Sequence, residues 1–121
     1  MITKVAFFAY GVSDMKKARK FYEEFLGLKS GSEFPAKDDS SYVEYDLPDG
    51  NTLAIGVSEQ WPPSPIGASI ALEVDDFENW VQKVKDHKVS VKTGPHDFPS
   101  CQMIAIQDQD NNPITIHQKK K

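Results

Sequence analysis

The sequence predicts an α+β fold of two tandem βαβββ modules that form a curved mixed sheet around a cavity. The 121 residues, 39% of them hydrophobic, suffice for one compact domain with a core. Patterns typical of strands and helices follow in the order β-α-β-β-β, twice along the chain. Two landmarks repeat at nearly one spacing: Asp14 corresponds to Asp76, an offset of 62 residues, and Asn51 corresponds to Asn112, an offset of 61. Four strands and one helix leave a sheet face bare, so the halves are expected to share a core.

The first module, residues 1–57, opens with a strand and a helix. Residues 2–12 are rich in β-branched and aromatic types and alternate as in a strand buried on both faces. Ser13 or Asp14 can cap a following helix, which Gly27 ends. The apolar residues of that helix recur at helical spacing and are Met15, Ala18, Phe21, Tyr22 and Phe25. Strands are predicted at residues 28–34, 41–47 and 52–57, with a turn at 48–51.

The second module, residues 68–118, repeats the first after a connector. Residues 58–67 hold three prolines and no periodicity, so they predict a connector whose Trp61 could cover a site. A strand at 68–74 leads to a cap at Asp75 or Asp76 and to a helix with the apolar stripe Phe77, Trp80, Val81 and Val84. We expect Trp80 in the core. Further strands are predicted at 89–92, 102–106 and 114–117, with a turn at 108–112 and a basic tail at 119–121.

Composition restricts the partners. With 18 acidic against 14 basic residues the net charge is −4, so no basic surface is expected to attract nucleic acid. No apolar run approaches the roughly 18 residues that cross a bilayer, and no signal peptide precedes the first strand, so no membrane partner is expected. The single cysteine, Cys101, fits a reducing compartment. These features favour a cytoplasmic protein.

Two segments carry a resemblance to a known superfamily. The segment VSDMKKARKFYEEFLGL is similar to the strand-to-helix signature of the vicinal-oxygen-chelate superfamily, and DQDNNPITI resembles its DPDGNxIEL turn, with Gln109, Asn111 and Thr115 as departures. This superfamily includes glyoxalase I, extradiol dioxygenases, methylmalonyl-CoA epimerase, fosfomycin-resistance enzymes and bleomycin-binding proteins. The resemblance covers nearly the whole chain and implies the paired βαβββ fold.

The resemblance also implies where a metal would bind. Metal-dependent members take a ligand from the first and the last strand of each module, and these positions correspond here to Phe7, Ala54, Ser69 and Thr115. A catalytic divalent ion needs about three ligands among His, carboxylate and thiolate side chains. The sequence therefore predicts no metal and no cofactor. If the strand register were shifted by one residue, the candidate metal ligands would be Glu44, Glu73, His96 and His117, but these do not fall at matching positions of the two modules.

Alternation along the strands indicates which side chains line the cavity. The predicted ligand-binding residues are Phe7, Ala54, Trp61, Ser69, Glu73, Thr115 and His117. His117 beside Glu73 could move a proton at neutral pH, although a solvated histidine at a strand end is the simpler interpretation. His96 is expected to form local hydrogen bonds in a loop.

Three functions are consistent with this pattern. The leading hypothesis is a metal-free protein, a homodimer, that binds a small organic ligand or antibiotic and sequesters it. The alternative is a lyase or isomerase acting on a small carbonyl compound, with Glu73 or His117 as general base. The third is a metalloenzyme whose ligands have been displaced.

Overall fold

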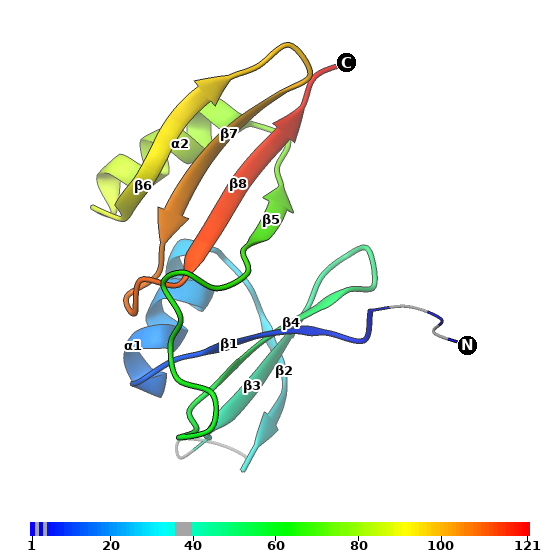
Figure 1. Ribbon diagram of the computed structural model, residues 1–121, viewed down its shortest axis with the longest axis vertical. Coiled ribbons are helices and arrows are strands. Elements are labelled where there is room, and N and C mark those ends of the chain that lie inside the picture. The colour runs from blue at the N-terminus through cyan, green and yellow to red at the C-terminus, as the bar shows by residue number, and fades with distance from the viewer. Residues whose placement is uncertain (2, 4, 36–39) are drawn as a thin grey trace. The chain divides into compact units, whose positions relative to one another are not determined.

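The chain forms two units of the same topology. The computed structural model describes all residues except 2, 4 and 36–39. The units span residues 1–64 and 65–121, and each holds a four-stranded mixed sheet and one helical segment (Figure 1). The strand orders are β1-β4-β3-β2 and β5-β8-β7-β6. The predicted α+β class and the duplicated βαβββ order are confirmed, and neither sheet closes into a barrel. A cavity shared by the modules stays a prediction.

The first unit is built around one buried sheet face. Its elements are β1 (Phe8–Gly11), α1 (Met15–Arg19), the π-helical segment η1 (Lys20–Phe25), β2 (Ser30–Phe34), β3 (Tyr42–Asp46) and β4 (Thr52–Gly56). Asp14 caps α1, because its side chain accepts a hydrogen bond from the Lys17 backbone N–H at 3.2 Å. The helical segment packs apolar residues on the sheet, and the buried apolar residues of the unit are Val12, Ala18, Tyr22, Phe25, Leu26, Val43, Tyr45, Leu53, Ala54 and Ile55.

The prediction of a first strand buried on both faces was wrong. β1 begins only at Phe8, and the side chains of Phe7 and Phe8 are 49% and 45% exposed. β1 pairs in parallel with β4 and lies at an edge of its sheet. An edge strand of four residues has neighbours on one side only, so its apolar side chains are not enclosed.

The second unit repeats this plan. Its elements are β5 (Ile70–Glu73), α2 (Phe77–Asp86), β6 (Ser90–Asp97), β7 (Cys101–Gln107) and β8 (Pro113–Lys119). Asp76 caps α2 through the Asn79 backbone N–H at 3.2 Å. The predicted turn at 108–112 is held by Asp108, whose Oδ1 accepts from the backbone N–H groups of Asp110 and Asn112 at 2.8 and 2.9 Å. The buried apolar residues are Phe77, Val84, Ile104, Ala105, Ile106, Ile114 and Ile116.

Three expectations for the second module need correction. His96 lies in β6 and not in a loop, because register shifts on either side of Thr93 let the strand pass Gly94 and Pro95 without losing its pairing to β7. Lys119 ends β8 and so does not belong to a tail. Trp80 is half-buried at the helix surface, with the Lys83 ammonium 4.4 Å from its ring centre, rather than in the core.

The duplication extends to individual residue pairs in the sheets and to backbone hydrogen bonds at the helix ends. Ala9 pairs with Ala54 as Ala71 pairs with Thr115, which reproduces the offsets of 62 (9 to 71) and 61 (54 to 115). The offset falls from 62 to 61 because the second module has one residue fewer than the first. The difference lies at the ends of the helices. The Leu28 N–H bonds the carbonyl of Tyr22, six residues back, whereas the equivalent bond from Val89 to Val84 spans five. The π-helical segment therefore holds one extra residue in the first module.

No helix among the described residues is both long enough and apolar enough to cross a bilayer.

Candidate functional site

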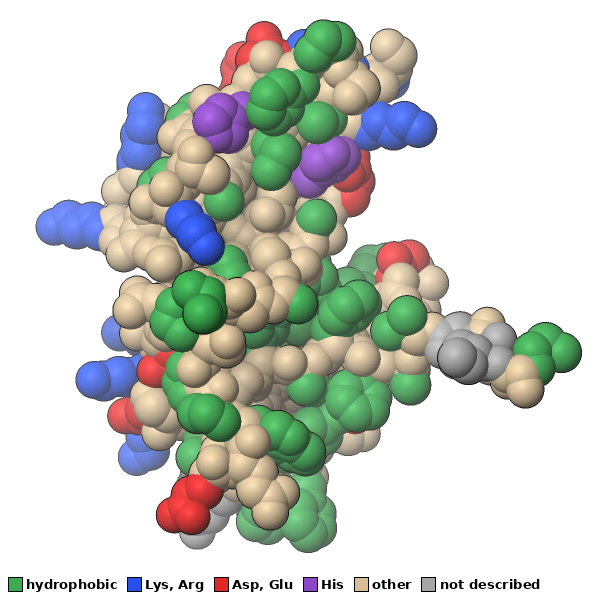
Figure 2. Space-filling view, viewed as in Figure 1, with side chains coloured by type: hydrophobic (Ala, Val, Ile, Leu, Met, Phe, Trp, Pro, Cys, Tyr) green, Lys and Arg blue, Asp and Glu red, His purple; other side chains and the backbone are tan. Residues whose placement is uncertain are grey.

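In the second unit, α2 covers one face of the sheet, and the opposite face carries both polar and apolar side chains. Gln118 points toward α2, since its Oε1 accepts from the Phe77 backbone N–H at 2.8 Å. Neighbouring residues of a strand alternate, so His117 lies on the other side. We call that side the distal face, and its residues are Ser69, Ala71, Glu73, Thr93, His96, Met103, Ala105, Thr115 and His117. Figure 2 shows histidine side chains beside hydrophobic and acidic ones on the surface of this unit.

Glu73 and His117 form a hydrogen-bonded pair on the distal face. They are direct partners in the register of β5 and β8, and His117 Nδ1 lies 2.5 Å from Glu73 Oε1. The second carboxylate oxygen accepts from the Lys119 backbone N–H at 2.7 Å. This backbone N–H, followed by the His117 side chain, lowers the pKa of Glu73. The carboxylate is therefore ionised near neutral pH, where it acts only as an acceptor.

Ser69 and Thr115 lie on the same face. Their hydroxyl oxygens are 3.5 Å apart, and Ala71 is the register partner of Thr115. The superfamily resemblance implies ligands to a divalent ion at these two positions and at Phe7 and Ala54. The donors there are two neutral hydroxyls, which do not repay the dehydration of such an ion. Among the described residues no three His, Cys, Asp or Glu side chains are grouped to hold a metal. The donor set does not fit a catalytic metal.

The first unit holds three of the predicted ligand-binding residues. Phe7 is half-exposed, whereas Ala54 is fully buried between Ala9 and Glu44 in the sheet register and offers no surface to a ligand. Trp61 is 66% exposed, in the connector. A Cβ atom placed on Gly11 would lie 2.0 Å from the Trp61 carbonyl oxygen, so the connector runs directly against β1.

Tyr42 and Glu44 share the sheet face on which Ala54 lies. The Tyr42 hydroxyl donates to Glu44 Oε2 at 2.7 Å. Burial, and then this bond to a carboxylate, raise the pKa of Tyr42 to about 12. Glu44 therefore already has a hydrogen-bond partner, and the pair gives this face a fixed polar group.

The seven predicted site residues thus divide between the units. Ser69, Glu73, Thr115 and His117 share the distal face of the second sheet, while Phe7, Ala54 and Trp61 belong to the first unit. That all seven line one site stays a prediction. Four further residues of the distal face were not predicted as ligand-binding: Met103 and Ala105, the register partners of His117 and Thr115, and beyond them His96 and Thr93. Strand alternation could have found Met103 and Ala105, whereas the irregular register of β6 hides His96 and Thr93.

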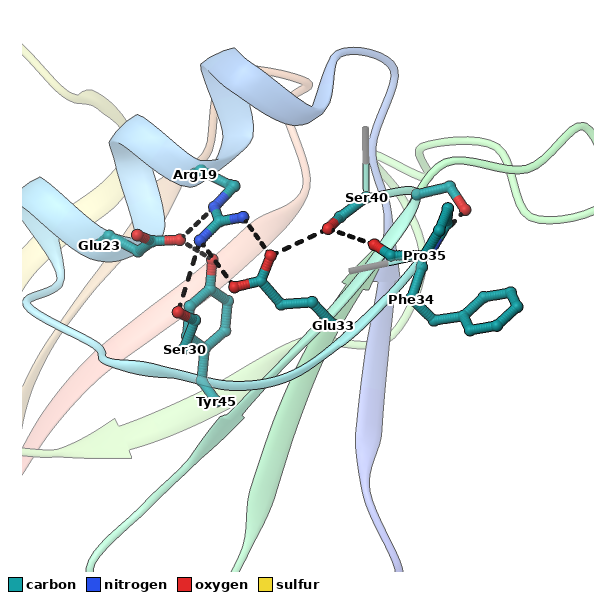
Figure 3. A network of polar contacts seen from close by, with 9 residues as sticks. Arg19, Glu23, Ser30, Glu33, Phe34, Pro35, Ser40 and Tyr45 are labelled. Carbon is teal, nitrogen blue, oxygen red and sulfur yellow. Dashed lines mark hydrogen bonds and ion pairs between the residues drawn. The ribbon is translucent and has the colours of Figure 1, made fainter. Parts of the chain in front are cut away.

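A polar network in the first unit was not predicted (Figure 3). Arg19 bonds Glu23 through Nε at 2.6 Å and Glu33 through Nη1 at 2.8 Å. The Tyr45 hydroxyl donates to Glu23 at 2.9 Å and the Ser40 hydroxyl to Glu33 at 2.9 Å. The Arg19 guanidinium lowers the pKa of Glu33. The spacing of Arg19 and Glu23 is the one signal in the sequence. These contacts join the helix to β2 and β3, which is a structural task.

A groove lies between α2 and the strands β6 and β7 of the second unit. It has a volume of about 320 Å³ and is lined by Phe77, Glu78, Val81, Gln82, Lys85, Pro95, His96, Asp97 and Gln102. His96 Nε2 is 2.8 Å from Thr93 Oγ1, and the imidazole stacks on Phe98 at 5.5 Å between ring centres. The local hydrogen bonding predicted for His96 is present. As the register partner of Met103, His96 lies on the distal face, two strands away from His117, and its side chain contacts Thr93 and Phe98.

Comparisons with known proteins place this geometry in a family. The chain is 28% identical to the metallothiol transferase FosB of Staphylococcus epidermidis over 123 residues, which cover 96% of this chain and 82% of that protein. The fold is similar to that of TnmS3, an antibiotic binding protein from Streptomyces sp. CB03234, with a TM-score of 0.81, 24% identity and 98% of each chain covered. A glyoxalase/dioxygenase from Nostoc punctiforme gives a TM-score of 0.81 at 21% identity, covering 98% of this chain and 92% of that chain. Residues 4–116 match one family model, and the chain therefore belongs to the Glyoxalase/Bleomycin resistance protein/Dioxygenase superfamily.

Proposed function

We propose that this chain is a metal-free, cytoplasmic protein that binds a small organic molecule and sequesters it, as a homodimer. The observation that carries the proposal is the contact between the Ser69 and Thr115 hydroxyls, 3.5 Å apart, at positions where the superfamily resemblance implies metal ligands. A similar fold occurs in TnmS3, which is described as an antibiotic binding protein. Sequestration needs shape, apolar surface and a few fixed polar groups, and it needs no metal.

The hydrogen bonds of Glu73 on the same sheet face support the same proposal. Glu73 is held by the Lys119 backbone N–H and by His117, so both of its oxygens have hydrogen-bond partners. A metal drawn to His117 would have to replace the contact at Nδ1 or bind Nε2 as a single protein ligand. One imidazole is well short of the roughly three ligands that hold a catalytic ion.

A thermal-shift screen tests this function. A compound that binds only the folded protein raises the melting temperature, by an amount that grows with its concentration relative to the Kd. We expect one or more planar organic molecules to raise it, and Zn²⁺, Mn²⁺, Ni²⁺ and Mg²⁺ to leave it unchanged. The staphylococcal relatives are named metallothiol transferases, so a shift with a divalent ion alone would favour a metal-dependent function instead.

A second function is favoured by the hydrogen-bonded pair of Glu73 and His117 on the distal face. His117 held by Glu73 at 2.5 Å has the arrangement of a general base oriented by a carboxylate, which suits an isomerase or lyase acting on a small carbonyl compound. Turnover of a compound found in the screen, lost in His117→Gln, would establish this function. Binding without turnover would reject it and leave the binding protein.

A further inference from the structure

We infer that His117 Nε2 anchors the ligand, and that the ligand is a planar molecule with an ionisable hydroxyl group, a phenol or an enol. This inference rests on the proposed binding function and names the chemical class of its ligand. It follows from three features of the distal face. Nδ1 of His117 carries a proton, Nε2 can either accept or donate a hydrogen bond, and the surrounding side chains restrict the shape of the ligand.

The contact with Glu73 determines where the first proton lies. An ionised carboxylate only accepts hydrogen bonds, so the nitrogen 2.5 Å from Glu73 Oε1, which is Nδ1, carries a proton. The Lys119 backbone N–H holds the other oxygen of Glu73 at 2.7 Å and keeps the carboxylate from turning away. In neutral His117 the lone pair is therefore on Nε2, and in the charged form Nε2 carries a second proton.

An ionisable hydroxyl satisfies both forms of this nitrogen. A neutral phenol or enol donates its O–H to the Nε2 lone pair. If the proton moves from the hydroxyl oxygen to Nε2, the O–H bond breaks, an N–H bond forms, and the resulting oxyanion accepts a hydrogen bond from the imidazolium. A ketone or ether only accepts, and it therefore has no partner on neutral His117.

The neighbours of His117 define the rest of the ligand. Met103 is its register partner on β7, and His96 on β6 is the next residue of that row, where its imidazole is held by Thr93 and Phe98. In the neighbouring row, Ala71 and Ala105 flank Thr115 on the same face as Met103. The side chains of Met103 and the two alanines are apolar, and those of the alanines are small, which leaves a flat surface. Thr115 is two residues from His117 on the same side of β8, roughly 7 Å away. Its hydroxyl oxygen contacts that of Ser69. A flat molecule with one hydroxyl at His117 and a second polar atom near Thr115 fits this arrangement.

A purely structural task for the Glu73–His117 pair makes different predictions. In that case Glu73 only ties the end of β5 to Lys119, and His117 only shields the carboxylate. Replacing His117 would then change stability but not the choice between ligands. A comparison of two ligands, one with a hydroxyl proton and one without it, therefore separates a ligand anchor from a purely structural role of His117.

The experiment compares 4-nitrophenol with 4-nitroanisole by equilibrium dialysis against the purified full-length chain. The two probes share ring and nitro group, and the methyl ether lacks the hydroxyl proton. We expect the wild type to bind 4-nitrophenol about tenfold more tightly, the effect of one good hydrogen bond. His117→Phe keeps a flat ring and removes both nitrogens, so this preference should vanish while the affinity for 4-nitroanisole stays within about twofold.

Two further variants complete the test. Glu73→Gln can still accept from the Lys119 N–H, but its amide can donate to Nδ1 and so place the proton on Nε2, which should reduce the preference for 4-nitrophenol. His87→Phe is the matched control, because His87 is exposed at the end of α2, and it should keep the preference.

The inference is overturned if the wild type does not bind 4-nitrophenol, if it binds both probes equally, or if His117→Phe keeps the preference for 4-nitrophenol. If another organic compound still raises the melting temperature, only the hydroxyl anchor is rejected. If no organic compound binds and a divalent ion does, the proposed function itself is rejected.

Discussion

Gly11 has no room for a side chain, because a Cβ atom there would lie 2.0 Å from the carbonyl oxygen of Trp61 and 2.8 Å from that of Pro62. Both are backbone atoms, so relief requires the connector to move. We expect Gly11→Ala to lower the free energy of unfolding by about 1 to 3 kcal/mol. Urea denaturation measures this. Gly56→Ala is the control, since its Cβ would meet Tyr42 Cδ1 at 3.5 Å and the Ser41 carbonyl oxygen at 3.6 Å, both ordinary contacts. An equal loss in both variants would contradict the steric explanation.

Glu33 predicts a specific dependence of stability on pH. Arg19 lowers the pKa of Glu33 below its ordinary 4.5 in the folded chain. A lowered folded pKa contributes stability that is fully present above 4.5 and is lost as the pH falls through the folded value. Glu33→Gln should therefore be less stable than the wild type at pH 7, and the difference should shrink below about pH 4. Urea denaturation at both pH values checks this, and a constant difference would exclude the ion pair as its cause.

Single residues were predictable where strand alternation decided their orientation. The sequence placed Glu73 and His117 on one face, and the structure makes them direct partners. Alternation says nothing about contacts between distant elements, so the link from Arg19 to Glu33 was not found. It also says nothing about what covers a strand, which is why the exposure of Phe7 was not predicted.

At the scale of elements, local chemistry was informative and strand length was not. Both helix caps and both turns lie where Asp, Asn and Gly predict them, because these side chains bond backbone groups within a few residues. The π-helical segment was visible only as the change of offset from 62 to 61. β6 was ended too early, since Gly94 and Pro95 normally interrupt a strand, whereas here its irregular register with β7 accommodates them.

The two caps give a paired prediction. Asp14 and Asp76 each accept from a backbone N–H three residues ahead, at 3.2 Å in both helices. We expect Asp14→Ala and Asp76→Ala each to cost about 1 kcal/mol of stability, measured by thermal or urea unfolding. Asp75→Ala is the matched control, because its neighbour Asp76 provides the cap. A cost for Asp75→Ala as large as for Asp76→Ala would show that charge rather than capping is responsible.

At the scale of the whole molecule, the repeated units leave edges and apolar side chains uncovered. β1 and β5 each end a four-stranded sheet, and the large exposed apolar side chains include Phe7, Phe34, Trp61, Val91 and Phe98. A second copy covering such surface would stabilise a dimer. Size-exclusion chromatography with light scattering should return about twice the 13.6 kDa of one chain, and a 13.6 kDa species at micromolar concentration would contradict the dimer.

The central claim is that the site around Ser69 and Thr115 holds no metal. Plasma mass spectrometry of the protein, purified without chelators from cells grown with added zinc, manganese, nickel and iron, measures the metal content directly. Neutral hydroxyls at Ser69 and Thr115 predict far less than one ion per chain. One equivalent of a single divalent metal, retained through dialysis, would contradict the account.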